Sequence, residues 1–196
     1  MNFSKTRIVC TLLGGLLLGA CGATSASSQS AHSLVSASAT EQTMTAYITG
    51  YSYWDNTPPG SGAIAFPVVH RSAGGQGTYD DPITLAVGHS IIGSSEIPDV
   101  PAGTRFYIER LKKYAVVEDV CGDGPNPQSG PCHTGHDGHP WFDLYIGGEK
   151  TTAQTTTACA RSITDLQTVI MNPAPNLPVA AGAVTDSACK ALAQAN

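Results

Sequence analysis

Short runs of strand-forming residues, separated by turns rich in glycine and proline, set the fold of this chain. These runs either alternate apolar and polar residues or are apolar throughout. They cover residues 44–54, 63–69, 83–88, 105–111, 112–120, 141–147 and 166–172. Six or seven short strands at this spacing predict an all-β domain, either a small closed barrel or a sandwich. We place this domain at residues 44–172.

The connections between these runs support the same interpretation. A hairpin is expected where two runs meet at Lys112 and Lys113. The loop around Pro58 and Pro59 cannot form regular structure, because proline lacks a backbone N–H. No strong helix is predicted, although residues 159–170 could begin with one turn capped by Ser162 or Thr164.

The N-terminal region has the pattern of an export signal in residues 1–21. Lys5 and Arg7 precede an apolar stretch that is too short for a permanent membrane span. The stretch ends in LLGAC, which resembles a bacterial lipobox with Cys21 as the lipidated residue; cleavage near the ATSA sequence is the alternative. Residues 22–43, rich in Ser, Ala and Thr, predict a flexible tether. Both alternatives place the mature protein outside the cytoplasm, and the first anchors it to a membrane.

Beyond Cys10 and Cys21, the chain has an even number of cysteines, which predicts two disulfides in an exported protein. These cysteines are Cys121, Cys132, Cys159 and Cys189. Of the three possible connectivities, we favour pairing along the chain. The first disulfide would then staple a loop, and the second would tie down the C-terminal tail, residues 173–196. A zinc site is the alternative, which the absence of a CxxC pair disfavours.

The charge distribution limits the partners of the protein. The formal net charge is −5, only 13% of the residues are charged, and no basic stripe is present. A nucleic acid is therefore not expected as a partner. The chain also contains no internal repeat and no second domain, so we expect a monomer. No cofactor or metal is expected.

Three aspartates lie where predicted strands meet loops, which is where functional sites are often built. They are Asp55, Asp119 and Asp143. Each has a structural alternative: Asp55 could form an Asx-turn, and Asp119 could accept backbone hydrogen bonds beside Cys121. Asp80 and Asp81, which precede a proline, are expected to form a turn.

Asp143 differs from the others because it interrupts an apolar strand between Phe142 and Leu144. Burial of a carboxyl among apolar groups raises its pKa, which allows the carboxyl to donate a proton near neutral pH. A glycosidic oxygen needs such a proton when its bond breaks. Asp143 is therefore the candidate general acid, with Asp119 as its electrostatic partner and Asp55 as a possible second carboxylate.

Aromatic side chains near these aspartates could stack against sugar rings. The candidates for substrate binding are Tyr47, Tyr53, Trp54, Trp141 and Tyr145, together with His139. His139 lies near Asp143 in the sequence and could instead tune its carboxyl. The spacing of His133, His136 and His139 also raises a metal hypothesis, but a glycine-rich loop does not fix these rings as ligands.

Several motifs resemble the double-psi β-barrel superfamily. The segment that begins at Ile97 and ends in VVED, followed by WFDLYIGG, is similar to the three-aspartate (3D) domain of muralytic proteins and to membrane-bound lytic transglycosylase A. FDL with a nearby histidine is similar to expansins and family-45 endoglucanases, and YWD at residues 53–55 is similar to the first catalytic motif of those endoglucanases. RlpA-like proteins belong to the same superfamily that the chain resembles. The resemblance implies a six-stranded double-psi barrel with long, disulfide-stapled loops.

The resemblance also implies roles for particular residues. Asp143 aligns with the catalytic acid/base of the transglycosylases, Asp119 with their neighbouring aspartate, and Asp55 with the first catalytic motif of the endoglucanases. The expected function is cleavage of glycosidic bonds in a cell-wall polysaccharide, either peptidoglycan or a β-glucan. The alternative is a non-catalytic, expansin-like module that binds polysaccharide.

Overall fold

The computed structural model describes residues 40–190. The strands are β1 Gln42–Tyr51, β2 Ile83–Val87, β3 His89–Ile92, β4 Ser95–Pro98, β5 Arg105–Ile108, β6 Lys113–Val120, β7 Trp141–Tyr145 and β8 Asp165–Met171. The helices are η1 Pro127–Ser129, α1 Pro131–Thr134 and α2 Ala153–Ile163. The predicted signal peptide, the lipidation residue Cys21 and nearly all of the tether lie outside the described residues.

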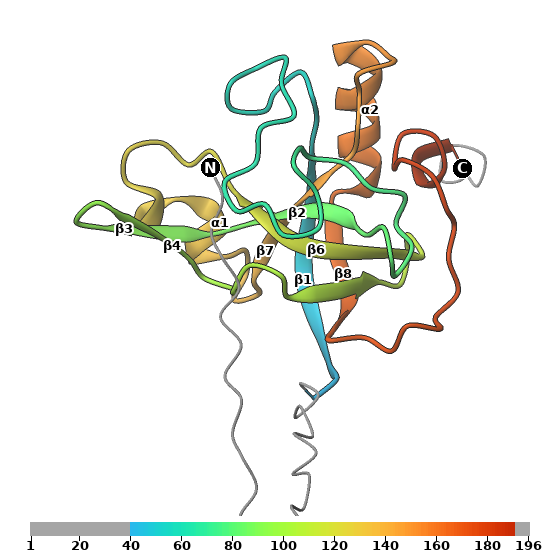
Figure 1. Cartoon of the computed structure of the whole chain (residues 1–196), viewed down its shortest axis with the longest axis horizontal. Helices are drawn as coiled ribbons and strands as arrows, with labels where there is room; N and C mark the ends of the chain where they lie inside the picture. Colours follow the sequence, from blue (N-terminus) through green and yellow to red (C-terminus); the bar gives the residue numbers. More distant parts are fainter. Residues whose placement is uncertain (1–39, 191–196) are drawn as a thin grey trace, which may run out of the picture. The chain divides into compact units, whose positions relative to one another are not determined.

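Six strands close into a barrel in the order β1-β7-β2-β6-β5-β8 (Figure 1). Two neighbouring pairs, β1 with β7 and β2 with β6, are parallel, and the other four pairs are antiparallel. The prediction of an all-β domain built on a closed six-stranded barrel is therefore confirmed. The mixture of parallel and antiparallel pairs is consistent with a double-psi barrel. The hairpin of β3 and β4 forms a separate two-stranded sheet beside the barrel.

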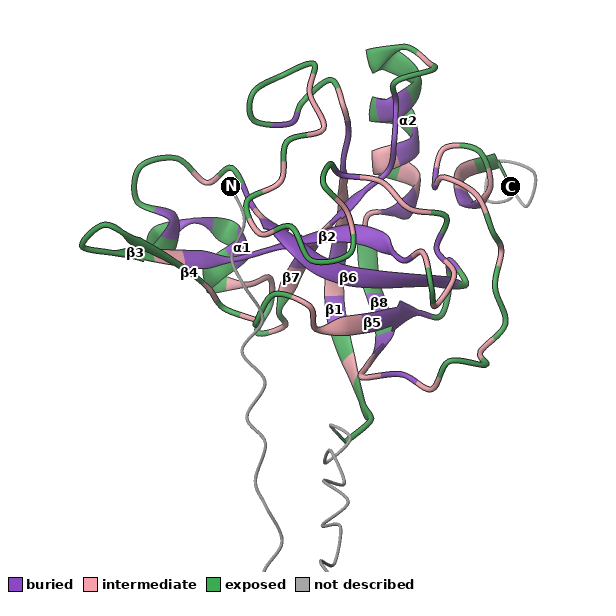
Figure 2. Ribbon diagram, viewed as in Figure 1, coloured by how far each residue is buried: buried purple, intermediate pink, exposed green. Residues whose placement is uncertain are grey.

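The core fills the inside of the barrel. Each of the six barrel strands contributes an apolar residue that is at most 1% exposed. These residues are Ile48, Leu85, Phe106, Val117, Leu144 and Val169. Strands β2 and β6 are buried along almost their whole length (Figure 2), because loops cover their outer faces as well.

The segment 63–69 does not form the predicted strand. It runs beside β6, but Pro67 has no amide hydrogen to donate, so a regular ladder cannot continue past it. The amides of Val68 and Val69 bind the side chain of Glu118 instead of a strand carbonyl. The sequence pattern of a strand was therefore misleading here.

Helix α2 was also missed, since only one turn was expected near its C-terminal end. The Thr152 hydroxyl caps it by accepting a hydrogen bond from the Thr155 amide at 3.2 Å. Thr164, proposed as a start, is the residue that ends the helix. The helix packs against β1 at Gly50, where an added Cβ would lie 3.0 Å from Ile163 and 3.4 Å from the backbone of Ala160. Threonine-rich segments have weak helix propensity, and here tertiary packing outweighs it.

The two predicted disulfides are present as Cys121–Cys132 and Cys159–Cys189. The second joins α2 to the C-terminal tail, as expected. Disulfides of this kind are typical of proteins that fold in an oxidising environment. No helix within residues 40–190 has the length and apolar character required to cross a membrane.

A buried lysine also holds the tail against the barrel. Lys113 on β6 is fully buried, and its ammonium donates hydrogen bonds to the backbone carbonyls of Gln76, Ala180 and Gly182. Burial lowers the pKa of Lys113 to about 8, so the side chain is still charged at neutral pH. The tail is therefore held by the Cys159–Cys189 disulfide and by hydrogen bonds from the charged Lys113 side chain.

Candidate functional site

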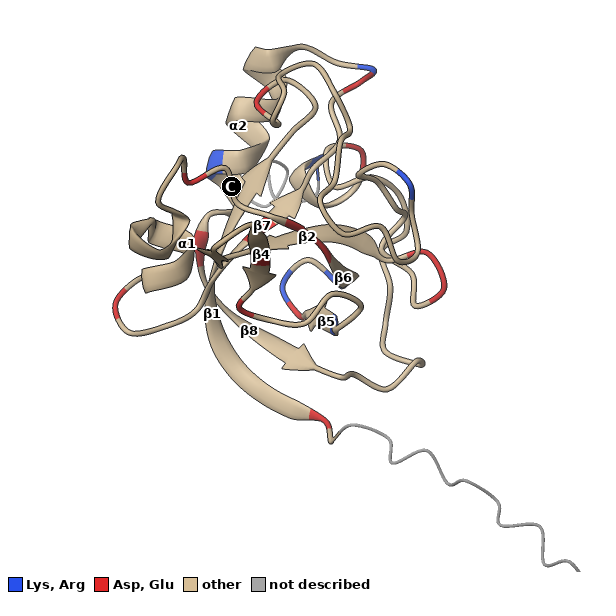
Figure 3. Ribbon diagram, turned by 60° about the vertical axis from the view of Figure 1, so that its left-hand side comes forward, with Lys and Arg blue, Asp and Glu red and all other residues tan. Residues whose placement is uncertain are grey.

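A groove of about 660 Å³ is lined by residues of the β3–β4 hairpin and of the loops after β1 and β6. The ribbon in Figure 3 labels β1, β4 and β6 among these elements. The three aspartates singled out in the sequence all line the groove. Two further acidic residues, Glu96 and Asp123, line it as well. The structure therefore brings together residues that are up to 88 positions apart in the chain, from Asp55 to Asp143.

Asp143 lies on β7 between its partner strands, opposite Thr49 on β1 and Ala86 on β2. Its carboxyl oxygen Oδ1 accepts a hydrogen bond from the Thr49 hydroxyl at 2.8 Å. The Thr49 hydroxyl in turn accepts one from the Trp141 indole N–H at 2.7 Å. Burial raises the pKa of Asp143 to about 7, and the nearby charges of Asp55, Asp123 and Asp119 act in the same direction.

This hydrogen-bond chain fixes the place of the acid proton. The Trp141 indole can only donate, so the Thr49 hydroxyl must direct its own hydrogen to Asp143 Oδ1. When Asp143 is protonated, its proton therefore sits on the other oxygen, Oδ2. Among the described residues, Oδ2 has no hydrogen-bond partner, and it is accessible rather than buried. The proton is thus held on the oxygen that remains open to the groove.

Asp119 is held far more tightly. Its Oδ2 accepts a hydrogen bond from the Tyr51 hydroxyl at 2.9 Å, and its Oδ1 accepts from the amides of Ala65 and Val120. Burial raises the pKa of Asp119, although these hydrogen bonds oppose the shift. The pKa of Tyr51 is raised well above its ordinary value by burial and by Asp119, so the tyrosine remains a donor. Asp119 is therefore a fixed, buried carboxylate beside Asp143.

Asp55 lies in the turn that follows β1. Its Oδ1 accepts hydrogen bonds from the backbone amide and from the hydroxyl of Ser52, each at 2.6 Å. The Asx-turn suggested by the sequence would use an amide that follows Asp55, whereas these hydrogen bonds come from Ser52, which precedes it. The same residue nevertheless lines the groove. The two roles are compatible, because only one carboxylate oxygen is used in the turn.

Glu96 and Asp123 were missed by the sequence reasoning. Glu96 on β4 lies 3.0 Å from the Nε2 of His89 on the adjacent strand. Asp123 accepts a hydrogen bond from the amide of Cys132 at 3.1 Å, next to the disulfide that also lines the groove. Both residues lie in segments without regular apolar periodicity. No pattern in the sequence therefore indicated which way their side chains point.

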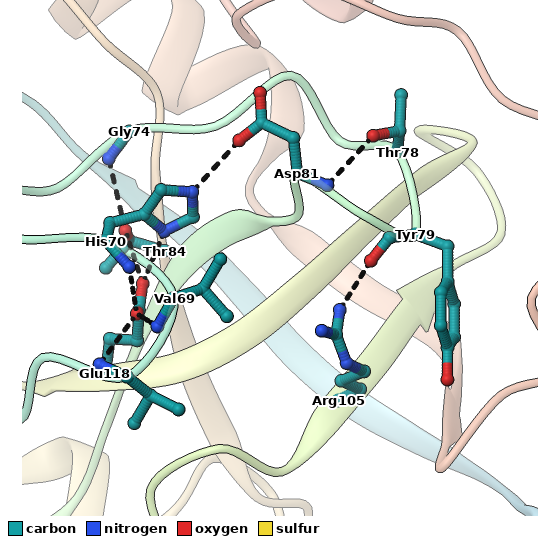
Figure 4. Close-up of polar contacts among 10 residues, drawn as sticks. Val69, His70, Gly74, Thr78, Tyr79, Asp81, Thr84, Arg105 and Glu118 are labelled. Atoms are coloured by element: carbon teal, nitrogen blue, oxygen red, sulfur yellow. Dashed lines mark hydrogen bonds and ion pairs between the residues drawn. The ribbon is translucent and has the colours of Figure 1, made fainter.

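The loop 63–70, whose first three residues line the groove, is anchored by a buried carboxylate (Figure 4). Glu118 is fully buried on the outer face of β6 and accepts hydrogen bonds from the amides of Val68, Val69 and His70. The His70 ring bridges Glu118 at 2.6 Å and Asp81 at 2.9 Å. Asp81, expected to form a turn, thus also contributes to this anchor.

The protonation of this anchor follows from its hydrogen bonds. Burial opposes the charge on His70, but the hydrogen bonds to Glu118 and Asp81 outweigh it, and the pKa of His70 is raised. Burial likewise opposes the charge on Glu118, and the bonds from His70, Val69 and Val68 lower the pKa of Glu118. The charged His70 ring therefore contributes its full stabilisation to the fold below the pKa of histidine in the unfolded chain, about 6.5. This contribution is lost as the pH rises through the raised pKa of His70 in the folded state. Glu118 stabilisation is lost only in acid, as the pH falls through its lowered folded pKa.

We expect His70→Ala to destabilise the domain by about 1–3 kcal/mol at about pH 6, and by clearly less at about pH 9. The reason is that the protein at the higher pH has already lost most of the His70 contribution. Urea unfolding at both pH values measures the difference. His139→Ala is the control, because it removes a partly exposed histidine that makes no side-chain hydrogen bond to a described residue. An equal loss at both pH values would contradict a protonated bridge.

The aromatic candidates are divided between several places. Trp141 lines the groove, and it is the one member of the predicted substrate-binding set that does so among the described residues. Tyr47 stacks on His136 with ring centres 4.0 Å apart. Trp54 is 41% exposed, but its indole binds the carbonyls of Gly148 and Thr151 outside the groove.

The remaining candidates are also outside the groove. Tyr145 is 2% exposed and its hydroxyl binds Glu149, so its ring is not accessible for stacking on a sugar. Tyr53 packs edge-on against the neighbouring Trp54 ring. His139 pairs through its backbone with His136 and does not line the groove, so it is not placed to tune Asp143. All three predicted acidic residues line the groove, whereas only Trp141 of the predicted aromatic residues does so.

The histidines of the loop 133–139 contact different groups. His133 binds Asp99 at 2.9 Å, whereas His136 stacks on an aromatic ring. In the part of the chain from residue 40 to 190, no group of three or more His, Cys, Asp or Glu side chains is arranged to hold a metal ion.

The fold and the site together define a small disulfide-linked β-barrel domain with an acidic groove at its side. The family model described as the DDB_G0273701 N-terminal domain matches residues 43–190. Because this match covers most of the chain, the protein belongs to that family. The match includes the C-terminal tail, which we had separated from the barrel domain.

A related protein comes from Dictyostelium discoideum, where it is described as the uncharacterized protein DDB_G0273701/DDB_G0273221. It is 36% identical over 126 residues, which are 63% of this chain and 48% of the relative. The chain therefore spans about half the length of that protein. No solved structure matches the chain.

Proposed function

We propose that the groove binds a polysaccharide chain, either peptidoglycan or a β-glucan, and that the protein cleaves its glycosidic bonds with Asp143 as the general acid. The observation that carries this proposal is the position of Asp143. It combines a pKa of about 7 with an unbonded oxygen that is open to a groove large enough for several sugar units. Trp141, which is linked to Asp143 through Thr49, provides an aromatic surface in the same groove.

The proposed step begins with Asp143 protonated on Oδ2. This oxygen donates its proton to the glycosidic oxygen as the bond to the sugar breaks, and the leaving hydroxyl departs neutral. The resulting Asp143 carboxylate keeps its hydrogen bond from Thr49. Asp119, fixed by Tyr51 and two amides, adds negative charge that favours the positively charged sugar in the transition state.

Two versions of the reaction differ in the group that attacks the sugar. In a lytic transglycosylase the sugar's own hydroxyl attacks, and one acid/base carboxyl is enough. An inverting hydrolase needs a second carboxylate about 6.5–9.5 Å away to activate water. Both oxygens of Asp119 already accept hydrogen bonds, so Asp55, which uses one oxygen in its turn, is the better candidate for the second carboxylate.

We expect Asp55→Asn to separate the two versions. Asparagine keeps the oxygen that accepts from Ser52, so the turn is retained, while the base is lost. For a hydrolase the rate should fall by about 100-fold or more. For a transglycosylase it should change by less than about tenfold, because Asp55 then acts only through its charge. Initial rates of product release measure the change.

The experiment that tests the proposed function is incubation of the purified protein with peptidoglycan and with a panel of β-glucans. Soluble products are identified by mass spectrometry. Anhydro-sugar ends would indicate a transglycosylase, and reducing ends formed with water would indicate a hydrolase. If the protein sediments with a polymer but releases nothing from any of them, the groove is a binding site of an expansin-like module, and the catalytic proposal fails.

We also propose that the protein acts outside the cytoplasm, either secreted or anchored through a lipid on Cys21. The two disulfides support the oxidising location. Mass spectrometry of the protein isolated from the membrane fraction of its host tests the anchor. A lipid-modified N-terminal Cys21 is expected, and an unmodified N-terminus further along the chain would contradict the anchor.

A further inference from the structure

The groove carries charge of one sign. Five acidic residues line it, and no lysine or arginine occurs among the described residues of its lining. The acidic residues are Asp55, Glu96, Asp119, Asp123 and Asp143. The positions of acidic and basic residues can be followed in Figure 3.

These acidic groups are hydrogen-bonded, but lysine and arginine do not neutralise those that are charged; Asp143, which is protonated at about pH 6, adds little charge. Within residues 40–190, Asp55, Asp119, Asp123 and Asp143 accept only from backbone amides and hydroxyl groups. Glu96 has a histidine, His89, as its partner, and 40% of the Glu96 side chain is exposed. The field of these groups is therefore available to a ligand that enters the groove.

A second feature of the groove lining is a histidine with one unpaired ring nitrogen. His89 lines the groove and is 5% exposed, yet its Nδ1 has no hydrogen-bond partner among the described residues. Buried polar atoms are normally paired, either with protein or with water or ligand atoms. The unpaired nitrogen lies on the residue that holds Glu96, at the hairpin side of the groove.

We propose that the groove selects glycans by charge: it binds an amine-bearing chain most tightly, a neutral chain less tightly, and a polyanionic chain most weakly. This inference rests on the proposed function, since it concerns the same groove. A carboxylate on the glycan would lie among like charges with no basic residue in the lining to compensate, which is unfavourable. An ammonium group would find partners in Glu96 and Asp123. By the same reasoning β-glucans rank above peptidoglycan, whose peptide stems carry carboxylates.

The test uses three β-1,4-linked hexasaccharides with the same glucan backbone: the glucosamine oligomer, the glucose oligomer and the glucuronic acid oligomer. Binding to the purified protein is measured by calorimetry at about pH 6, where the sugar amine is protonated. At low salt the amine-bearing chain should bind about tenfold more tightly than the neutral one, because each partly exposed charge contact contributes only a few-fold. This difference should shrink as salt is added.

A variant that lacks two of the acidic groove residues tests whether the charge selection arises in the groove. Glu96→Gln with Asp123→Asn should weaken binding of the amine-bearing chain and strengthen binding of the anionic one. The control is Asp80→Asn with Glu109→Gln, which removes the same charge from exposed residues outside the groove and should leave the ranking unchanged.

The possible failures are distinguishable. If the anionic oligomer binds as tightly as the amine-bearing one, the charge selection is overturned while the glycan groove stands. If the control pair changes the ranking as much as the groove pair, the selection belongs to the net charge of the protein and the inference is wrong. If none of the three oligomers binds, the β-glucan version of the proposed function and the inference fail together.

Discussion

Lys113→Met is expected to destabilise the domain by about 3 kcal/mol, a large part of the stability of a typical small domain. Methionine fills a similar volume but donates no hydrogen bond. The carbonyls of Ala180 and Gly182, which lie in the tail, would lose a charged donor while remaining covered by protein. The tail should then detach more readily, although the Cys159–Cys189 disulfide still tethers it.

The matched control for Lys113 is its neighbour Lys112, which is exposed. Lys112→Met removes the same charge from the surface and should change stability by less than about 0.5 kcal/mol. Guanidinium unfolding of both variants measures the difference. Equal stabilities for the two variants would show that the buried ammonium does not hold the tail.

Asp143→Asn is expected to reduce glycan cleavage by about 100- to 10,000-fold, the usual contribution of a general acid. Asparagine can still accept the hydrogen bond from Thr49, so the local geometry is retained. The wild-type rate should decline as the pH rises above about 7, because the acid must be protonated and burial raises its pKa to that value. The residual activity of the variant should lack this decline.

Asp143→Asn should lower the activity, but it should not lower the stability of the fold above about pH 7. The folded-state pKa of Asp143 is raised from 3.8 to about 7. Between these values the folded state binds more protons than the unfolded state, so stability falls as the pH rises through this window. Asparagine removes this penalty, and the variant should be at least as stable as the wild-type protein above about pH 7. A variant that loses both activity and stability would instead mark Asp143 as a structural residue.

Much of the barrel could be predicted because closed sheets leave local patterns in the sequence. Segments such as 83–87 and 141–145 are short, apolar and bounded by turn residues, and both became barrel strands. The errors have physical causes that act over longer distances. The strand-like segment 63–69 is held by Glu118 rather than by a ladder, and α2 depends on packing against β1 and on a disulfide.

The residues of the candidate site likewise include some that local patterns predicted and one that they did not. Asp55, Asp119 and Asp143 were identified because they end or interrupt strands, and the structure places all three at one groove. Glu118 was overlooked although it precedes Asp119. The register between β2 and β6 shifts at this point, from Leu85–Val117 to Ala86–Asp119, so Glu118 has no partner residue on β2. Its side chain binds the loop amides of residues 68–70 instead, and no local pattern in the sequence indicated this irregularity.

The proposed reaction depends on Asp143, which must keep its proton in a large fraction of the molecules at neutral pH. Its carboxyl can be followed directly by carbon-13 NMR during a pH titration of the purified protein, and the signal can be assigned by its absence in Asp143→Asn. We predict a titration midpoint at about 7. A midpoint near the ordinary value of 3.8 would mean that Asp143 is a carboxylate at neutral pH, and it would contradict the role of general acid.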